Sequence, residues 1–282
     1  MKKLFSLTIA ISISLAFSVR AIAQEKKEEE GGGSDAAEMA RKLQDPLANI
    51  KALMTDNDIN FNTGNDQTSY GFQLQPVYAV SFDNAGFNLI NRAVIPIMGI
   101  APEGQRPIIG SDPLPSDPDG DLNWGLSDMS LQFFFSPKTE AKWKWGLGPM
   151  VTLKTRTNNN FAGPGWGGGP VLVLVGGVGK LSIAGIGGQV WGEQNFSLSF
   201  VQPMLFYNIG DKGWTVHYNN IVSHDWNASS GNAWTVPLGI GTSKAISLGK
   251  IGIEPNLGFY WNVASPEGAA DQIIKWAVNF LF

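Results

Sequence analysis

The chain has 282 residues, a formal net charge of −4 and no cysteine, so neither a lipid-modified cysteine nor a disulfide scaffold is available. Its 20 basic and 24 acidic residues form no basic cluster, so nucleic acid is not an expected partner, because phosphate binding needs grouped Lys and Arg. The 34 glycines, 10 tryptophans and 16 phenylalanines, with only 16% charged residues, favour one large β-barrel over ordinary globular domains.

The N-terminus has the features of a secretory signal peptide. Lys2 and Lys3 precede an apolar stretch at 4–19, and residues 21–23 (AIA) supply the small side chains of a cleavage site. We therefore predict that residues 1–23 direct export and are removed after Ala23.

A charged and glycine-rich segment follows. Residues 24–34 (QEKKEEEGGGS) cannot form a core, which predicts a flexible periplasmic leader. Asp35 to Gln44 is expected to form a short helix with Asp35 as its cap. This helix either docks under or into the next domain or is a frayed tail, and we assign 24–47 to the leader.

From residue 48 onward, apolar and polar residues alternate, as in strands with one face on lipid and the other on a lumen. Between 252 and 263, one face carries Ile253, Leu257, Phe259, Trp261 and Val263, and the other carries Glu254, Asn256, Gly258, Tyr260 and Asn262. Similar segments occur at 52–63, 68–82, 86–101, 124–136, 142–155, 166–177, 180–192, 195–209, 213–225, 232–245, 249–264 and 271–282. The sequence thus predicts an all-β fold, a closed antiparallel transmembrane β-barrel of about 12 strands over 48–282.

The connections and the aromatic residues predict the orientation of this barrel. Tight turns are expected at 83–85, 137–141, 177–179, 210–212 and 247–248, and a long loop at 101–123. Near the long-loop ends lie Trp124, Trp166, Trp191, Trp226, Trp234 and Trp261; near the short turns lie Phe133, Trp143, Trp145, Trp214 and Phe282. Two aromatic girdles and short periplasmic turns are typical of outer-membrane barrels, so we expect an outer-membrane location.

Prolines inside the predicted strands are the main difficulty for this reading. They are Pro76, Pro96, Pro149, Pro170, Pro203, Pro237 and Pro255. Because proline removes a donor from the ladder, we expect bulges or kinks at these levels. A soluble β-sandwich would not relieve the difficulty and would leave the Trp-rich outward faces unexplained.

Several stretches, in this order along the chain, resemble a known family. They are AEMARKLQDPLANIKAL, GLSDMSLQFFFSPK, KWKWGLGPM, GWGGGPVLVLV, WTVPLGIG and SPEGAADQIIKWAVNFLF. They are similar to the outer-membrane proteins grouped as the MetA-pathway of phenol degradation family. The chain departs from that family by its acidic residues 25–30 and by ending on Phe282. The resemblance implies an outer-membrane channel linked to hydrophobic or aromatic compounds.

The alternation places a set of polar side chains toward the lumen, where they are candidate pore-lining residues. They are Gln73, Gln75, Arg92, Asp128, Gln132, Lys144, Lys154, Gln189, His217, Asn219, Glu254, Asn256 and Lys275. Charges of both signs would give a passage for small solutes a polar lining and a transverse field. In the alternative interpretation the charges neutralise one another in a barrel too narrow to conduct.

Other functions have weaker support in the sequence. A hydrolase needs a nucleophile beside a base, and the chain's two histidines, His217 and His224, have no suitably placed serine, so we expect no catalytic residues. The acidic run Asp117 to Asp121 is a weak match to a calcium loop, and a solvated loop is favoured, so we expect no metal and no cofactor. A structural or surface-interaction barrel stays open as an alternative.

The C-terminal strand suggests the partners of the protein. Ile274, Trp276, Val278, Phe280 and Phe282 form a stripe that resembles the signal by which barrel-assembly machinery recognises its substrates. The expected partners are this machinery, outer-membrane lipid and a small-molecule solute.

Overall fold

The computed structural model describes residues 32–64, 67–100, 122–161, 163–249 and 251–282. The predicted signal peptide, residues 24–31 of the leader and the acidic run Asp117 to Asp121 lie outside the described residues. Within the described ranges, none of the helices is long and apolar enough to cross a membrane.

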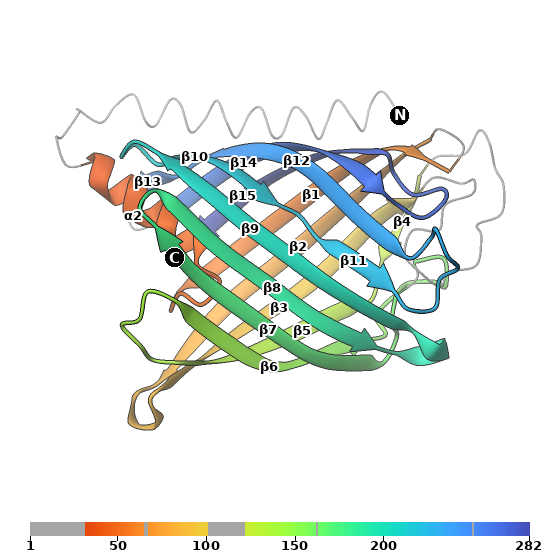
Figure 1. Ribbon diagram of the computed structural model, residues 1–282, viewed down its shortest axis with the longest axis horizontal. Coiled ribbons are helices and arrows are strands. Elements are labelled where there is room, and N and C mark those ends of the chain that lie inside the picture. The colour runs from red at the N-terminus through yellow and green to blue at the C-terminus, as the bar shows by residue number, and fades with distance from the viewer. Residues whose placement is uncertain (1–31, 65–66, 101–121, 162, 250) are drawn as a thin grey trace.

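In the described part of the chain, one α-helix precedes fifteen strands that form a single sheet (Figure 1). The elements are α2 (Gly32–Gln44), β1 (Lys51–Thr63), β2 (Gln67–Phe82), the 3₁₀ turn η1 (Asp83–Ala85), β3 (Phe87–Ile100), β4 (Asn123–Leu126), β5 (Met129–Pro137), β6 (Lys144–Leu153), β7 (Gly167–Val178), β8 (Leu181–Trp191), η2 (Glu193–Asn195), β9 (Ser197–Ile209), β10 (Trp214–Asn219), β11 (Val222–Asp225), β12 (Trp234–Lys244), β13 (Ile246–Leu248), β14 (Ile251–Ala264) and β15 (Gln272–Leu281).

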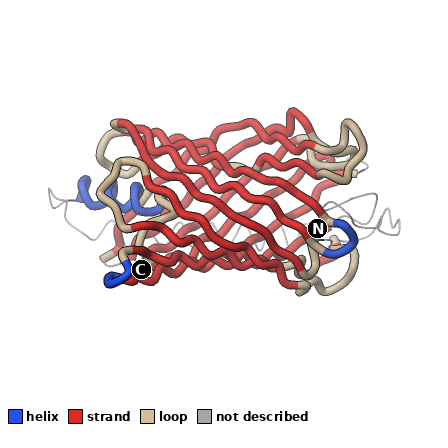
Figure 2. The backbone as a smooth tube through the Cα atoms, turned by 60° about the horizontal axis from the view of Figure 1, so that its bottom comes forward, coloured by secondary structure: helices blue, strands red, loops and turns tan. Residues whose placement is uncertain are grey.

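The sheet closes on itself because β1 pairs antiparallel with both β2 and β15. Three positions in the wall are each filled by two strands that are consecutive in the sequence: β4 with β5 beside β3, β10 with β11 beside β9, and β12 with β13 beside β14. The wall is therefore a closed antiparallel barrel of twelve strand positions, as predicted. The strands cross the barrel at a tilt, with turns and loops gathered at its two ends (Figure 2).

Side chains alternate between the outside and the inside of this wall. In β6, Trp145, Leu147 and Val151 are exposed, whereas Met150 and Thr152 are buried. Exposed tryptophans, leucines and valines recur around the outer surface. An apolar exterior around a closed ladder suits lipid contact, because every backbone group of the wall can pair within the barrel.

The helix begins earlier than the sequence predicts. It starts at Gly32, so Asp35 lies within the helix and is not its cap. The helix packs against β8, β9, β10 and β13, whose ends form short turns. We call this the short-turn end of the barrel and the opposite one the long-loop end; the C-terminus lies at the short-turn end (Figure 1).

Two predicted turns are misplaced. Of the turn predicted at 177–179, Gly177 and Val178 are part of β7, where they pair with Ser182 and Leu181. Residues 247–248 are part of β13, where Ile246 pairs with Ile253 and Leu248 with Ile251, so the strand continues beyond the predicted turn. The chain then reverses at Gly249, which has φ of 64°. Glycine takes this left-handed conformation without the steric cost of a Cβ.

At five of these seven prolines the ladders are interrupted without the bulges that we expected, and register shifts occur at the other two. At Pro76, Pro149, Pro170, Pro203 and Pro255, pairing to one neighbouring strand is skipped and then resumes in the same register. The same prolines stay paired to the neighbour on the other side. A strand residue directs its N–H toward one neighbour only, so proline removes a donor from one ladder and leaves the other intact.

Register shifts accompany the other two of the seven prolines. Pairing of β3 moves by one residue between β5 and β4 at Pro96, and pairing of β12 with β14 shifts between Val236 and Pro237. Beside Pro237, residues 236–240 also lack ladder partners on β10 and β11. There Tyr218 Oη donates to the Pro237 carbonyl at 2.6 Å, which joins the two strands through a side chain.

Candidate solute pathway in the barrel lumen

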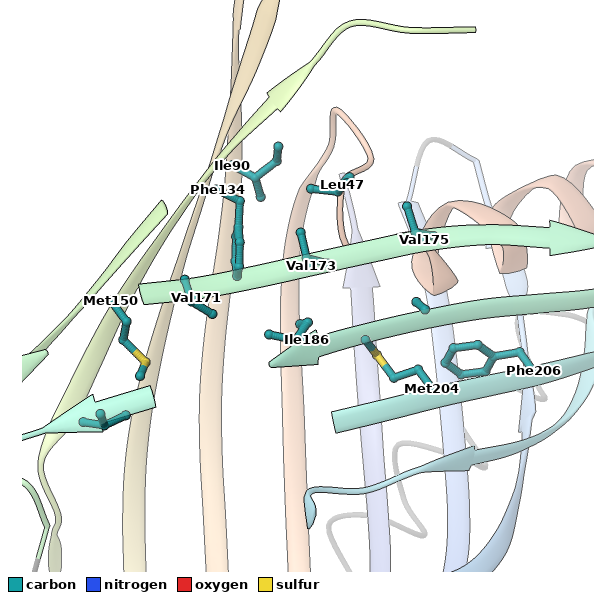
Figure 3. Close-up of a cluster of buried hydrophobic side chains, with 12 residues drawn as sticks. Leu47, Ile90, Phe134, Met150, Val171, Val173, Val175, Ile186, Met204 and Phe206 are labelled. Carbon is teal, nitrogen blue, oxygen red and sulfur yellow. The ribbon is translucent and has the colours of Figure 1, made fainter. Parts of the chain in front are cut away.

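The inward side chains divide the lumen into two walls of opposite character. The apolar wall comes mainly from strands β5 to β9, and β3 contributes one residue. Leu47, from the segment before β1, packs on this wall. The members of the apolar wall are Leu47, Ile90, Phe134, Met150, Val171, Val173, Val175, Ala184, Ile186, Val190, Met204 and Phe206 (Figure 3). The polar wall comes from β1, β2, β3, β14 and β15; its members are Asp56, Asp58, Gln73, Gln75, Arg92, Glu254, Asn256, Lys275 and Asn279.

The alternation predicted a polar lining of the lumen and did not reveal the apolar wall. A signal for it exists at 171–175 (VLVLV), where both alternating positions are apolar, as in a strand buried on both faces. In β7, Val171, Val173 and Val175 are buried, while Leu172 and Leu174 face outward.

A three-residue ion cluster lies at the centre of the polar wall. Lys275 Nζ is 2.7 Å from Asp56 Oδ2 and 3.0 Å from Asp58 Oδ1. Both carboxylates come from β1, which pairs with β15, so the strand register itself brings Lys275 opposite Asp58. Two carboxylates share one ammonium, which leaves this cluster with one excess negative charge.

Arg92 lies where the polar wall meets the apolar wall. Its Nη2 donates to Gln75 Oε1 at 2.6 Å and its Nη1 to Gln132 Oε1 at 3.2 Å. Gln75 Nε2 in turn donates to Gln73 Oε1 at 2.8 Å. The structure thus joins four of the predicted pore-lining residues in one hydrogen-bonded chain.

The β14 side of the lumen carries a buried carboxyl group. Ser243 Oγ donates to Glu254 Oε1 at 2.9 Å and Asn279 Nδ2 donates to Oε2 at 3.1 Å. Nearby, Gln202 Nε2 donates to Asn219 Oδ1 at 2.8 Å. Glu254 is therefore held by neutral donors.

Residues of the leader contact lumen-facing side chains at the short-turn end. Gln44 is buried and its Nε2 donates to Asn208 Oδ1 at 2.9 Å and to Thr215 Oγ1 at 3.2 Å. Lys144, a predicted lumen residue, is 3.1 Å from Asp45 Oδ2. Leu47 is buried against the apolar wall. Of the two alternatives for the leader helix, docking into the barrel is therefore the one observed.

The exposed face of α2 carries its own ion pair. Lys42 Nζ is 2.7 Å from Glu38 Oε1, one turn away. The hydrogen bond and the positive charge of Lys42 lower the pKa of Glu38. Both side chains are largely solvated, so the pair adds little to stability.

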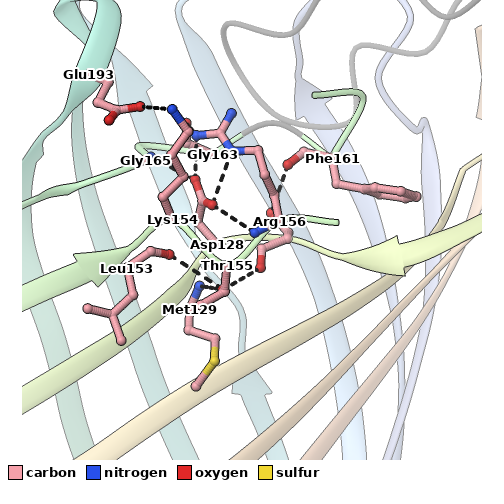
Figure 4. Close-up of polar contacts among 11 residues, drawn as sticks. Asp128, Met129, Leu153, Lys154, Thr155, Arg156, Phe161, Gly163, Gly165 and Glu193 are labelled. Carbon is pink, nitrogen blue, oxygen red and sulfur yellow. Dashed lines mark hydrogen bonds and ion pairs between the residues drawn. The ribbon is translucent and has the colours of Figure 1, made fainter. Parts of the chain in front are cut away.

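At the long-loop end, the carboxylate of Asp128 forms an ion pair with Arg156 (Figure 4). Its carboxylate accepts hydrogen bonds from Arg156 Nη2 at 2.6 Å, from Arg156 Nε at 3.1 Å and from the Gly165 backbone N–H at 2.7 Å. The Asp128 side chain has no exposed surface. This ion pair holds the loop between β6 and β7 on the barrel, so Asp128 is not a free lumen charge.

Lys154 and Gln189 also lie at the long-loop end. Lys154 Nζ is 2.6 Å from Glu193 Oε2, and both side chains are partly exposed. Gln189 Nε2 donates to Ser197 Oγ at 3.1 Å, and Gln189 Oε1 accepts from Trp226 Nε1 at 3.2 Å. These residues are far along their strands from the central polar wall.

A cavity of about 120 Å³ lies between the two walls and the leader. Seven of the predicted pore-lining residues border it: Gln75, Arg92, His217, Asn219, Glu254, Asn256 and Lys275. Gln73 is hydrogen-bonded to Gln75, and Gln132 to Arg92. The other four predicted residues lie toward the two ends of the barrel: Asp128, Lys144, Lys154 and Gln189. That these residues line a conducting path stays a prediction.

The two histidines sit among aromatic rings. The centroid of His217 is 5.8 Å from that of Phe206, and His224 lies 4.6 Å from Trp226 and 4.5 Å from Trp234. Among the described residues, neither histidine is hydrogen-bonded to a serine or threonine hydroxyl. Their surroundings resemble packing sites, and the expectation of no catalytic residue stays a prediction.

A closed twelve-strand antiparallel barrel with an apolar exterior defines the architectural class, that of transmembrane β-barrels. The COG4313 outer membrane channel from Pseudomonas putida F1 is similar, with a TM-score of 0.57 and 13% sequence identity over 83% of this chain and 96% of that chain. The NanC porin is similar with a TM-score of 0.50 and 10% identity over 82% of this chain and 98% of that chain.

No protein-family model and no curated protein sequence matches the chain. The resemblance to the MetA-pathway of phenol degradation family is therefore not confirmed. At identities this low, the two structural neighbours establish the fold and leave the solute open.

Proposed function

We propose that this protein is an outer-membrane channel for the passive passage of small solutes, including hydrophobic or aromatic ones. The observation that carries the proposal is the amphipathic cavity between the two lumen walls, inside a closed barrel with an apolar exterior. A solute with an apolar body and a polar group could contact both walls at once. The structural neighbours, a channel and a porin, support the channel class.

The orientation follows from the general rule for such barrels. Short turns face the periplasm and long loops face outward. The leader then enters the lumen from the periplasmic side, where a segment released by a signal peptidase would lie. We infer outer-membrane lipid and the barrel-assembly machinery as partners on the same grounds.

A single-channel conductance measurement on the refolded mature protein tests the proposal. We expect small, discrete conductance steps, because the leader narrows the lumen at one end. The same protein in liposomes should pass a monocyclic aromatic solute faster than a sugar of similar mass. Absence of both ion and aromatic flux in verified, folded protein would contradict the channel function.

One observation favours a second candidate, a non-conducting structural or surface-interaction barrel. The buried Gln44 and Leu47 fill the lumen at the short-turn end, and ion pairs occupy several of the lumen charges. In that case the loops at the long-loop end would carry the function. Loss of surface binding after loop deletion, together with absent flux, would support this candidate.

A further inference from the structure

Arg92 differs from the other cations that contact the lumen or its mouths. Lys144, Lys154, Arg156 and Lys275 are each within 3.1 Å of a carboxylate oxygen. Among the described residues, no carboxylate oxygen lies within 4.0 Å of a guanidinium nitrogen of Arg92. Its guanidinium instead donates to two neutral amide oxygens, from Gln75 and Gln132.

The carboxylate that acts on this guanidinium electrostatically does not neutralise it by contact. Asp56 acts on Arg92 electrostatically, but its Oδ2 is held by Lys275 at 2.7 Å. A guanidinium has five N–H donors, and the two amide contacts leave the others available to a ligand. A partly buried cation with no acidic side chain in contact is costly, so such a group is a candidate for ligand binding.

The position of Arg92 specifies what the rest of the ligand would contact. Arg92 and Ile90 face the lumen from β3, and β5 places Gln132 and Phe134 beside them. Across the cavity lie Ile186, Met204 and Phe206. An anionic group on Arg92 would therefore be next to apolar side chains on one side, which suits a ligand with a compact hydrophobic body.

The cavity volume limits the size of that body. At about 120 Å³, it is comparable with the cavity of about 150 Å³ that holds benzene in another protein. One six-membered ring is thus the natural size for the space between the walls.

We propose that Arg92 forms a subsite for the carboxylate of a monocyclic aromatic acid, with the ring packed on Phe134, Ile186 and Met204. This inference rests on the proposed function, since it takes the lumen as the path of the solute. The planar guanidinium can donate two parallel hydrogen bonds to a carboxylate, a geometry that an ammonium group cannot reproduce.

The test compares three probes that share one ring: benzoate, benzyl alcohol and benzylamine. Isothermal titration of the folded mature protein in detergent should give benzoate an affinity at least about tenfold above that of benzyl alcohol, because the hydrogen bonds to Arg92 are charge-assisted. Arg92→Gln should remove this preference and leave benzyl alcohol binding nearly unchanged. Arg92→Lys should keep part of it.

Lys180→Gln is the matched control, since it removes the same charge from an exposed short turn. It should bind all three probes as the parent does, and heat-modifiable migration should verify that every variant is folded. Equal binding of benzoate and benzyl alcohol by the parent, a preference for benzylamine, or an unchanged benzoate preference in Arg92→Gln would each overturn the subsite.

Conductance separates this proposal from the proposed function. A protein that conducts but does not prefer benzoate retains the channel function and refutes the subsite. A protein that binds benzoate through Arg92 but passes no solute confirms the subsite and refutes the channel.

Discussion

The apolar and polar walls of the lumen are built on the same backbone architecture but are stabilised in opposite ways. On the apolar wall, side chains such as Val173 and Phe134 have almost no exposed surface and pack against one another. On the polar wall, Lys275, Asp56 and Glu254 depend on specific partners at hydrogen-bonding distance. The same alternation of strands therefore produces a hydrophobic core on one side and a network of polar contacts on the other.

This difference bears on the proposed function, in which a closely packed barrel interior has to accept a solute. Apolar contacts are non-directional, so a bound ring can replace them with small losses. A charged network is directional, and removing one member leaves the others unpaired in a medium of low dielectric constant. Perturbing the two walls with matched substitutions should therefore give unequal effects.

The largest effect is expected from a charge on the apolar wall. Val173→Asp would place a carboxylate among Leu47, Phe134 and Val171 with no basic partner, which costs several kcal/mol. The variant should fail to assemble or should lose heat-modifiable migration. Asn256→Asp, the matched change on the polar wall, should assemble. Normal folding of both variants would show that the walls do not differ in this respect.

A slightly smaller effect is expected from breaking the ion cluster. Lys275→Met leaves Asp56 and Asp58 facing each other without a cation, which should lower the free energy of unfolding by about 3–5 kcal/mol. Guanidinium-induced unfolding in detergent measures this change. Adding Asp56→Asn and Asp58→Asn to Lys275→Met should restore much of the loss. If the triple variant is no more stable than the single one, charge imbalance is not the cause.

The sequence predicted the barrel better than it predicted the lumen, for physical reasons. Strand alternation depends on a period of two and on local residues, so the twelve wall positions and most turns could be read from the pattern. The contacts of a lumen residue come from strands far away in sequence. Asp128 could not be recognised as a partner of Arg156 because a loop, and not a strand, delivers that guanidinium.

The prolines illustrate the same limit at the level of the backbone. The sequence indicates that a donor is missing, but not which neighbouring ladder loses it. At Pro149, the ladder to β5 is interrupted while Pro149 still pairs with Pro170 on β7. That choice depends on the face of the side chain, which the alternation gives, and on which strand lies on each side, which a single strand pattern does not contain.

A moderate effect is expected from loosening the leader on the apolar wall. Leu47→Ala removes a buried side chain from the contact with Phe134 and Val173, at a cost of about 2–5 kcal/mol to the docking of the leader. The lumen should then open more often at the short-turn end, so single-channel conductance should rise. Leu174→Ala, on the outward face, should leave conductance unchanged. A rise in both variants would indicate a general loss of barrel stability.

The smallest effect is expected when the sign of one charge at the short-turn end is reversed. Lys144→Glu replaces a cation by an anion beside Asp45, a change of two charges at the mouth of the lumen. A charge in a narrow passage with walls of low dielectric constant acts strongly on a passing ion. Reversal potentials across a salt gradient should therefore shift toward cation selectivity, while Val151→Thr on the outward face should leave selectivity unchanged.

Because Lys144 is paired with Asp45, this last variant also disturbs the leader, and a further substitution separates the two effects. Repulsion between the introduced glutamate and Asp45 should loosen the leader and raise conductance. The exchanged pair, Asp45→Lys with Lys144→Glu, restores attraction and the original net charge of the mouth. The pair should therefore return both conductance and selectivity toward the parent values. If the exchanged pair restores conductance but stays as cation-selective as the single variant, the net charge of the mouth does not set the ion preference.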